Sequence, residues 1–274
     1  FVRGMLEETK PTQFDTLVRL SGFSHGTDVW LGNARDLIVS GTANVNQAIG
    51  CRDDIMLYLI KCGLPEKRAF KIMEAVRKGR GLPDGAEQEM IDAGVPDWYI
   101  GSCKKIKYLF PKAHAVAYVM MAFRIAWFKV HHPLAFYAAY FYRRSQKDGF
   151  DAGMMCHGIE TVKENLTAIK AKEDATAKDK ELLATLQMVR EAQARGIKFL
   201  KVDLVKSASR AFLPEDGAVR MPFNALPGLG DTAADQIVEV REHSEFYSIE
   251  DLRERTGISK SVIEILRRHG TLDG

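Results

Sequence analysis

Apolar residues recur at helical spacing over the first part of the chain, and glycine or proline separates the apolar segments. The pattern predicts short amphipathic helices that begin near residues 11, 53, 65, 86 and 96. Pro65 suits the first turn of its helix, and Gly63 and Gly79 suit helix ends. Residues 21–38, "SGFSHGTDVWLGNARDLI", place glycines among small polar residues, so we expect a loop there.

The most apolar run in the chain is "KYLFPKAHAVAYVMMAFRIAWFKVHHP", residues 107–133. Its longest uncharged part, Ala115–Phe123, is much shorter than the roughly 20 residues that a membrane-crossing helix needs, so no membrane span is predicted. We expect a helix of a soluble protein instead. The residues expected to pack in its core are Val116, Val119, Met120, Ile125 and Phe128.

The pattern changes after this run. An aromatic helix is predicted over 133–146, and the Ala-, Lys- and Glu-rich residues 161–196 predict solvated helices. From Lys198 the apolar runs become short, and Asp216–Gly217 is a hairpin signal. A helical unit punctuated by glycine follows over 223–274. The predicted fold class is therefore mainly α: a helical domain, a small β-containing connector and a small helical module.

Composition is that of a soluble globular protein, because 46% of the 274 residues are hydrophobic and 27% are charged. The formal net charge of +3 does not by itself indicate a nucleic-acid partner. No Cys-x-x-Cys pair occurs, which leaves a zinc site without local support and favours reduced thiols in a cytoplasmic protein. The cysteines are Cys51, Cys62, Cys103 and Cys156.

The N-terminal sequence "FVRGMLEETKPTQF" lacks the charged-then-apolar pattern of a signal peptide. It begins at Phe1 and has no initiator methionine. We therefore expect the chain to be a piece of a longer protein.

Near the C-terminus a glycine-rich turn, "LPGLG" (Leu226–Gly230), leads directly into a helix, "DTAADQIVEVRE". Glycines around one apolar residue allow a tight turn with outward-pointing amides, and the following helix adds its N-terminal dipole. This combination suits one phosphate and resembles the helix-hairpin-helix motif, which grips the DNA backbone without reading its sequence. Leu229 is expected to anchor the turn in the core, while the amides of Gly228 and Gly230 face the phosphate. The alternative is an ordinary Pro-Gly turn before a helix.

A second, degenerate copy of this pattern is predicted in "RTGISKSVIEILRRHG", where a single glycine remains in the turn. Its hairpin is expected near Gly257–Lys260, with basic side chains beside it. The DNA-binding candidates of this copy are Gly257, Lys260, Arg267 and Arg268.

Two basic clusters flank an aromatic region in the first half of the chain. Such clusters suit a polyanion, for example a triphosphate or a nucleic-acid strand. The alternative is a pair of solvated helix ends, where Lys and Arg commonly complement the helix dipole. The first cluster is Lys71, Arg77, Lys78 and Arg80, and the second is Lys104, Lys105 and Lys107.

The start of the apolar helix has an unusual set of polar residues. His114 and Tyr118 are four residues apart and should share one helix face. Lys112 stands at the helix entrance, where a cation opposes the helix dipole and a bound anion would reverse that penalty. The alternative for His114 is a histidine satisfied within a core.

Four segments together carry a resemblance to a known family: "SGFSHGTDVWLGNARDLI", "IGCRDDIMLYLI", "CKKIKYLFPKAHAVAYVMMAFRIAWFKVHHPLAFYAAYF" and "FNALPGLGDTAADQIVEVRE". They resemble the C-terminal part of the PolC-type α subunits of replicative DNA polymerase III from low-GC Gram-positive bacteria, which are family C polymerases. The stretch "FPKAHAVAY" also resembles the general family C pattern Phe-x-Lys-Ser/Ala-His-Ala-x-Ala-Tyr. The likeness runs along nearly the whole chain.

The resemblance implies that residues 1–200 are a fingers domain, which binds the incoming dNTP and covers the nascent base pair. Residues 201–274 would be a connector and a tandem helix-hairpin-helix domain that holds duplex DNA. The full enzyme would perform template-directed nucleotidyl transfer with two Mg²⁺ ions. The ligands of those ions are palm aspartates that Asp28, Asp53 and Asp54 do not match, so no catalytic or metal-binding residue is expected in this chain, and the chain alone should be inactive.

The partners implied by the resemblance are primer-template DNA, a dNTP, and the remaining palm, thumb, PHP and exonuclease domains. A sliding clamp would bind a peptide expected after "GTLDG", which is not present in the chain. The implied location is the cytoplasm, without a membrane.

Site residues follow from the resemblance by motif position. The residues expected near the triphosphate are Lys112, His114, Lys71, Arg77, Lys104 and Lys107. Those expected around the base pair are Tyr118, Arg19, Ser21, Ser24 and His25. Anilinouracil inhibitors of the family mimic a purine nucleotide, and their pocket is expected at Ser21, Ser24, His25 and Phe110.

Two other functions compete with this interpretation. A freestanding DNA-binding or repair-associated protein would use the hairpin alone and keep the first two hundred residues as a scaffold. Such a scaffold has no need for Lys112, His114 and Tyr118. A metal enzyme based on His131 and His132 is disfavoured, because those histidines lack spaced partner ligands.

Overall fold

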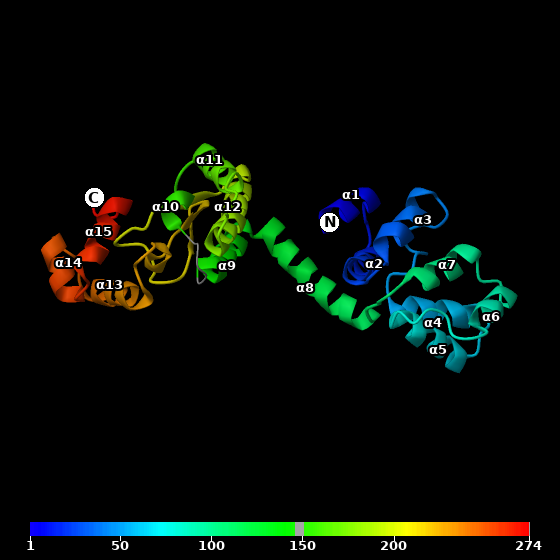
Figure 1. Cartoon of the computed structure of the whole chain (residues 1–274). Helices are drawn as coiled ribbons and strands as arrows, with labels where there is room; N and C mark the ends of the chain where they lie inside the picture. Colours follow the sequence, from blue (N-terminus) through cyan, green and yellow to red (C-terminus); the bar gives the residue numbers. More distant parts are fainter. Residues whose placement is uncertain (146–150, 274) are drawn as a thin grey trace. The chain divides into compact units, whose positions relative to one another are not determined.

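The structure is a computed structural model that describes residues 1–145 and 151–273. It divides into two compact units, Phe1–Arg124 and Ile125–Gly274, and each unit has its own hydrophobic core. The division falls within one long helix, α8 (Lys112–His131), which is shown in green in Figure 1. Helices dominate both units, so the predicted mainly α fold is confirmed.

The first unit consists of helices and connecting loops. Besides the first part of α8, its helices are α1 (Val2–Thr9), α2 (Phe14–His25), α3 (Arg35–Val39), α4 (Arg52–Lys61), α5 (Glu66–Arg77), α6 (Ala86–Asp92) and α7 (Asp97–Lys105). Phe23, Ile55 and Tyr99 are almost completely buried in its core. Helices α4 and α5 form an antiparallel pair that reverses near Gly63, where φ is 98°. The predicted helix end at Gly63 is confirmed.

The segment predicted as a loop, residues 21–38, begins instead as the last part of α2, which continues to His25. Gly22 lies inside that helix, where an added Cβ would come within 2.0 Å of the Gly50 carbonyl oxygen. The loop prediction was therefore wrong for residues 21–25, and it was also wrong for residues 35–38, which lie in α3. At Gly22 the missing side chain permits close packing of two backbone segments and does not mark a turn. A left-handed turn occurs later, at Gly32, where φ is 69°.

An extended segment, residues 106–111, draws the ends of several helices together. The Leu109 amide donates to the Arg77 carbonyl at the end of α5, and the Phe110 carbonyl accepts from the Arg52 amide at the start of α4, at 3.3 and 3.0 Å. A backbone bridge also joins this segment to the residues after α2. The starts of α4 and α8 therefore lie near the ends of α2 and α5.

Helix α8 joins the two units, and Ala115 is its one buried residue. Met120 is 41% exposed, and Ile125 and Phe128 are each 51% exposed. The prediction that these three residues are core residues was wrong, since they are exposed and belong to neither hydrophobic core. Val116 and Val119, by contrast, are half-buried.

By length and composition alone, α8 could cross a membrane. A single helix of this kind is weak evidence for a membrane span. Arg124 and Lys129 place charge within the helix, which is costly in a bilayer.

The second unit joins helices to one small sheet. Besides the last turns of α8, its helices are α9 (Pro133–Ser145), α10 (Ala152–Met155), α11 (Ile159–Lys170), α12 (Ala177–Ala194), α13 (Asp231–His243), α14 (Ile249–Thr256) and α15 (Lys260–His269). The last residue of the aromatic helix predicted over 133–146 lies outside the described residues. The polar region predicted to be helical forms α11 and α12, which confirms that prediction.

The sheet has the strand order β1-β3-β2, with β1 (Lys198–Leu200), β2 (Leu213–Glu215) and β3 (Ala218–Arg220). Strands β2 and β3 lie in the predicted connector, whereas β1 precedes its expected start at residue 201. Strands β2 and β3 are antiparallel and turn at Asp216–Gly217, where both residues have positive φ. This turn confirms the predicted hairpin.

One core continues across the expected domain boundary at residues 200 and 201. The Phe141 ring of α9 lies 5.1 Å from the Phe199 ring and 6.1 Å from the Phe212 ring, measured between centroids. Residues on both sides of the boundary therefore fold as one unit. The functional division at this point stays a prediction.

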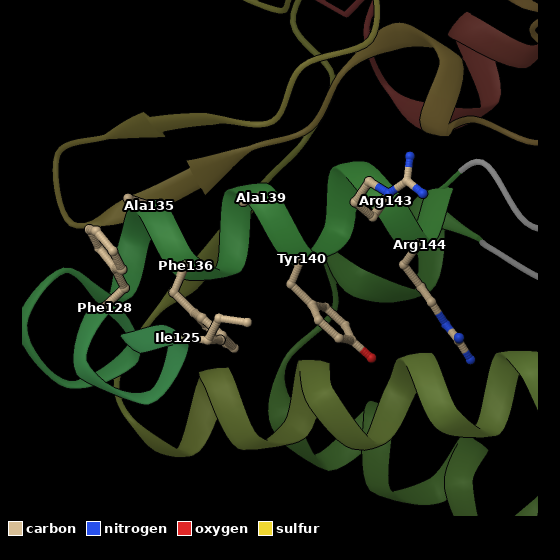
Figure 2. A pocket seen from close by; sticks show the side chains of 8 residues that line it. All are labelled: Ile125, Phe128, Ala135, Phe136, Ala139, Tyr140, Arg143 and Arg144. Carbon is tan, nitrogen blue, oxygen red and sulfur yellow. The ribbon is translucent and has the colours of Figure 1, made fainter. Parts of the chain in front are cut away.

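Within the second unit, the last turns of α8 and one face of α9 line an open, mostly apolar cavity of about 650 Å³ (Figure 2). Arg144 points from α9 toward α12, where it donates to the Thr185 hydroxyl at 3.1 Å and pairs with Glu181 at 2.8 Å. The residues that line the cavity are Ile125, Phe128, Ala135, Phe136, Ala139, Tyr140, Arg143 and Arg144. No predicted site residue is among them.

Candidate functional site

The predicted nucleotide-side residues meet where α2, α4 and α8 come together. Lys112 begins α8, and its Nζ lies 3.0 Å from Asp15 Oδ1 of α2. The hydrogen bond between them raises the pKa of Lys112 and lowers the pKa of Asp15. The Lys112 backbone amide donates to Asp53 Oδ2 of α4 at 2.6 Å.

Two carboxylates thus compensate the cation at the start of α8. Asp53 caps the first amide of the helix, and Asp15 pairs with the Lys112 side chain. The chain therefore supplies its own negative charge beside Lys112, and no bound anion is needed to offset the cation at this position. An external anion would have to compete with Asp15 for Lys112.

Arg19 belongs to the same network. Its guanidinium donates to Asp54 Oδ2 at 3.1 Å and to the Ala48 carbonyl at 3.1 Å, and it lies 3.6 Å from Asp15. The Arg19 side chain is only 16% exposed. Arg19 therefore holds α2 against α4, and its expected position near the base pair stays a prediction.

Aromatic rings form a continuous row beside this network. The Phe110 ring stacks on His114 with centroids 5.1 Å apart, and His114 lies 4.6 Å from Tyr118. His25 and Tyr108 contact Phe110 edge-on, at 5.7 and 5.2 Å. The predicted sharing of one helix face by His114 and Tyr118 is confirmed, and Tyr118 is 64% exposed.

Part of the predicted inhibitor pocket comes together in this row, because His25 and Phe110 are in contact. Ser21 and Ser24 are half-buried on the last turns of α2. The Ser24 hydroxyl donates to the Ser21 carbonyl at 2.9 Å, so its hydrogen-bonding capacity is partly used inside the helix.

The other predicted cations differ in their pairing. Arg77 donates two hydrogen bonds to Glu74, at 2.8 and 3.0 Å, which holds the pKa of Glu74 at about 2. Lys104 pairs with Glu87 at 2.6 Å. Lys71 and Lys107 are exposed, and neither has an ion-pair partner among the residues that the structure describes.

The first glycine-rich hairpin has the geometry that its sequence predicts. Gly228 is left-handed, with φ of 88°, and Leu229 is 3% exposed, so Leu229 anchors the turn in the core as predicted. Gly230 is the N-cap of α13, and no side chain caps that helix. Within the described part of the chain, the amides of Gly228 and Gly230 have no hydrogen-bond acceptor.

The second hairpin repeats this turn with different side chains. Gly257 is left-handed with φ of 70°, Ile258 is 4% exposed in the place of Leu229, and Ser259 caps α15. The two N-caps, Gly230 and Ser259, have nearly the same backbone angles, φ of −77° and −72°. The Ser259 hydroxyl, however, accepts from the Val262 amide at 3.3 Å, so this copy satisfies part of its own helix start.

Basic side chains accompany the second hairpin. Lys260 opens α15, and Arg267 and Arg268 lie in its last turn. Arg267 forms an ion pair with Glu264, and the Arg268 side chain donates to the Glu264 carbonyl at 3.4 Å. The degenerate copy predicted from sequence is therefore a real structural repeat of the first.

Comparisons with known proteins agree with both halves of this description. The family described as "Bacterial DNA polymerase III alpha subunit finger domain" matches residues 1–95, and the family described as "Helix-hairpin-helix motif" matches residues 196–274. The chain is 54% identical over 274 residues to the DNA polymerase III PolC-type of Bacillus subtilis (strain 168), which covers 100% of the chain. The chain is a homologue of part of PolC-type DNA polymerase III.

Other PolC-type relatives agree. The identity is also 54% with those of Listeria innocua serovar 6a and Caldanaerobacter subterraneus subsp. tengcongensis, again over 100% of the chain. The chain spans 19% of the length of each of these relatives. The resemblance to the PolC-type family predicted from the four quoted segments is therefore confirmed.

Sequence reasoning missed the acidic residues of the PolC-like site. Asp15, Asp53 and Asp54 are not among the residues that the sequence assigns to the site, yet each binds a cation or an amide at the junction of α2, α4 and α8. The sequence pattern that could have identified two of them is the adjacent pair Asp53–Asp54 in the first turn of a predicted helix, where carboxylates act as caps.

These carboxylates do not fit a magnesium site. Asp54 Oδ2 accepts from the Gly50 and Cys51 amides at 2.9 and 3.0 Å in addition to its bond from Arg19. Among residues 1–145 and 151–273, no group of three or more His, Cys, Asp or Glu side chains could hold a metal ion.

His131, one of the two histidines of the alternative metal-enzyme hypothesis, is the last residue of α8 and lies against Trp127, with ring centroids 4.6 Å apart.

His269 fastens the hairpin module to the connector and makes stability depend on pH. Its Nε2 accepts from the Val202 amide at 2.9 Å, and burial followed by the charge of Lys201 lowers its pKa below 6.5. The unfolded chain binds the proton of His269 more readily than the folded chain does. The contribution of His269 to the free energy of unfolding is therefore fully present above pH 6.5 and is lost as the pH drops toward the folded-state pKa. We expect a lower Tm at about pH 5 than at about pH 7.5, measured by circular dichroism.

His269→Gln is the control for this prediction. The glutamine keeps an acceptor for the Val202 amide but has no proton to gain, so the variant should lose part of the acid-induced decrease in Tm. An identical pH profile for the variant and the natural chain would contradict the assignment.

Proposed function

We propose that this chain supplies the fingers and the duplex-binding region of a bacterial replicative DNA polymerase of PolC type. In this proposal, residues 1–200 bind the incoming dNTP and the nascent base pair, and residues 201–274 hold the duplex behind them. The full enzyme performs template-directed nucleotidyl transfer in the cytoplasm, and the chain alone is inactive.

One observation carries this proposal: the chain is similar to PolC-type polymerases over its whole length and not only in the hairpin region. A freestanding helix-hairpin-helix protein needs only the C-terminal similarity. The match of residues 1–95 to a polymerase finger domain favours the polymerase.

On the nucleotide side, Lys112 and His114 stand at the exposed start of α8, between the acidic network and the aromatic row. A triphosphate that displaced Asp15 from Lys112 would gain a cation already oriented by its neighbours. The exposed rings of His114 and Tyr118 offer a stacking surface next to that cation. Lys71 and Lys107 add cations with no competing ion pair within the described ranges.

On the duplex side, the unsatisfied amides of Gly228 and Gly230 and the basic side chains of α15 support contacts to phosphates of any sequence. The remaining palm, thumb, PHP and exonuclease domains and the sliding clamp are partners of the proposed full enzyme. Mg²⁺ would supply charge neutralisation at the reacting phosphates from palm carboxylates outside this chain. The residues described here would bind and orient the nucleotide and the duplex.

The test of this proposal is binding of the chain to a short duplex, measured by fluorescence anisotropy over a series of salt concentrations. We expect weak binding whose log K falls linearly with log salt, with a slope of about −0.9 for each phosphate contact. The chain should incorporate no nucleotide, whereas a full-length polymerase carrying it should. Binding that does not depend on salt, or no binding at low salt, would contradict the duplex-holding part.

A further inference from the structure

The first hairpin has two carboxylates beside the amides that are proposed to bind a phosphate. Asp231 opens α13 directly after Gly230, and Asp235 follows one turn later. Both side chains are exposed, at 56% and 44%. Two carboxylates this close to the unsatisfied amides of the hairpin would repel a DNA phosphate.

Arg210, from the loop between β1 and β2, reaches both carboxylates. One terminal nitrogen lies 3.3 Å from Asp231 Oδ2, the other forms an ion pair with Asp235, and Nε lies 3.3 Å from Asp235 Oδ1. Hydrogen bonding to Arg210 lowers the pKa of Asp235, so the pair remains charged on both sides at neutral pH.

Asn224 completes this arrangement. Its amide nitrogen donates to Asp231 Oδ1 at 2.9 Å, so both carboxylate oxygens of Asp231 are engaged by the connector. The negative charge of Asp231 is therefore held by neighbouring side chains beside the turn and does not stand alone next to the Gly230 amide.

We propose that Arg210 is a positioning residue for the phosphate site of the first hairpin. It neutralises Asp231 and Asp235 and ties their carboxylates to the connector, so that the amides of Gly228 and Gly230 can accept a DNA phosphate. Arg210 does not itself touch the phosphate. This inference rests on the proposed duplex-holding function.

The test is duplex binding by the Arg210→Ala chain at low salt and over a salt series. We expect affinity to fall about three- to tenfold, because two uncompensated carboxylates then face the phosphate. The slope of log K against log salt should stay unchanged, since no phosphate contact is lost. Adding Asp231→Asn and Asp235→Asn to the Arg210→Ala chain should restore the natural affinity, which a purely structural role for Arg210 would not predict.

Arg35→Ala is the matched control. Arg35 is 42% exposed, against 46% for Arg210, and also pairs with an acidic side chain, Glu8, at 2.9 Å. It belongs to the first unit, whereas both hairpins belong to the second. This variant should bind DNA as the natural chain does. Thermal unfolding of every variant shows whether it is folded at the binding temperature.

The outcomes separate this inference from the function on which it rests. Unchanged affinity in Arg210→Ala would overturn the positioning role. It would also be overturned if the slope of log K against log salt became less steep by about one and the asparagine changes did not restore affinity. If Lys260→Ala and Gly230→Val weaken binding in the same assay, the duplex-holding function stands in either case. If neither weakens it, the proposed function itself fails.

Discussion

Replacing Lys112 by alanine in a full-length polymerase that carries this chain is expected to raise the KM for dNTP about tenfold or more, with a smaller change in kcat. Lys112 is the cation at the exposed start of α8, and its side chain is fixed by Asp15. Charge-assisted contacts to a phosphate are among the strong hydrogen bonds of proteins, so their loss should appear mainly as weaker nucleotide binding. Steady-state primer extension at varied dNTP measures this effect.

Lys163→Ala is a matched control for that measurement. Lys163 is 43% exposed, against 38% for Lys112, and pairs with Glu160 at 2.7 Å. It lies on α11 in the second unit, so its loss should leave the KM for dNTP unchanged. An equal KM in the Lys112 variant and the natural enzyme would show that Lys112 serves only to pair with Asp15.

Replacing Gly230 by valine is expected to weaken duplex binding about tenfold without unfolding the chain. The backbone of Gly230 is extended, with φ of −77°, and an added Cβ meets no atom within 4 Å, so the fold tolerates a side chain there. The valine would instead obstruct the approach of a phosphate to the Gly230 amide. Fluorescence anisotropy with duplex DNA measures the change in Kd.

Gly158→Val is the corresponding control. Gly158 is the N-cap of α11, with φ of −64° and the same open space around its Cα, but it lies outside both hairpins. Any general cost of valine at a helix N-cap should appear equally in both variants. Equal DNA affinities for the two variants would refute the assignment of the phosphate to the first hairpin.

Local features of the fold could be predicted from the sequence because their causes are local. The Asp216–Gly217 turn needs two residues that tolerate positive φ, and the buried Leu229 needs one apolar side chain between two glycines. Most helices of the first unit follow from apolar spacing together with terminal Gly and Pro. The likeness to PolC-type polymerases likewise rests on contiguous motifs such as "FPKAHAVAY".

The errors occurred where the outcome depended on distant parts of the chain. Gly22 resembles a turn residue in sequence, but it lies inside α2, where the Gly50 backbone packs too closely for a side chain. Met120 and Phe128 are as apolar as core residues, yet they are exposed and belong to neither hydrophobic core. Periodicity reports which residues share a helix face and cannot report whether another element covers that face.

The sequence by itself thus determined the mainly α class, the hairpin turns and the likeness to the polymerase family. The tertiary structure alone decided which charges meet, pairing Lys112 with Asp15 and Arg210 with Asp231 across separate elements. The physical reason is range: dihedral preferences and apolar spacing act within a few residues, whereas an ion pair forms only after whole elements have docked.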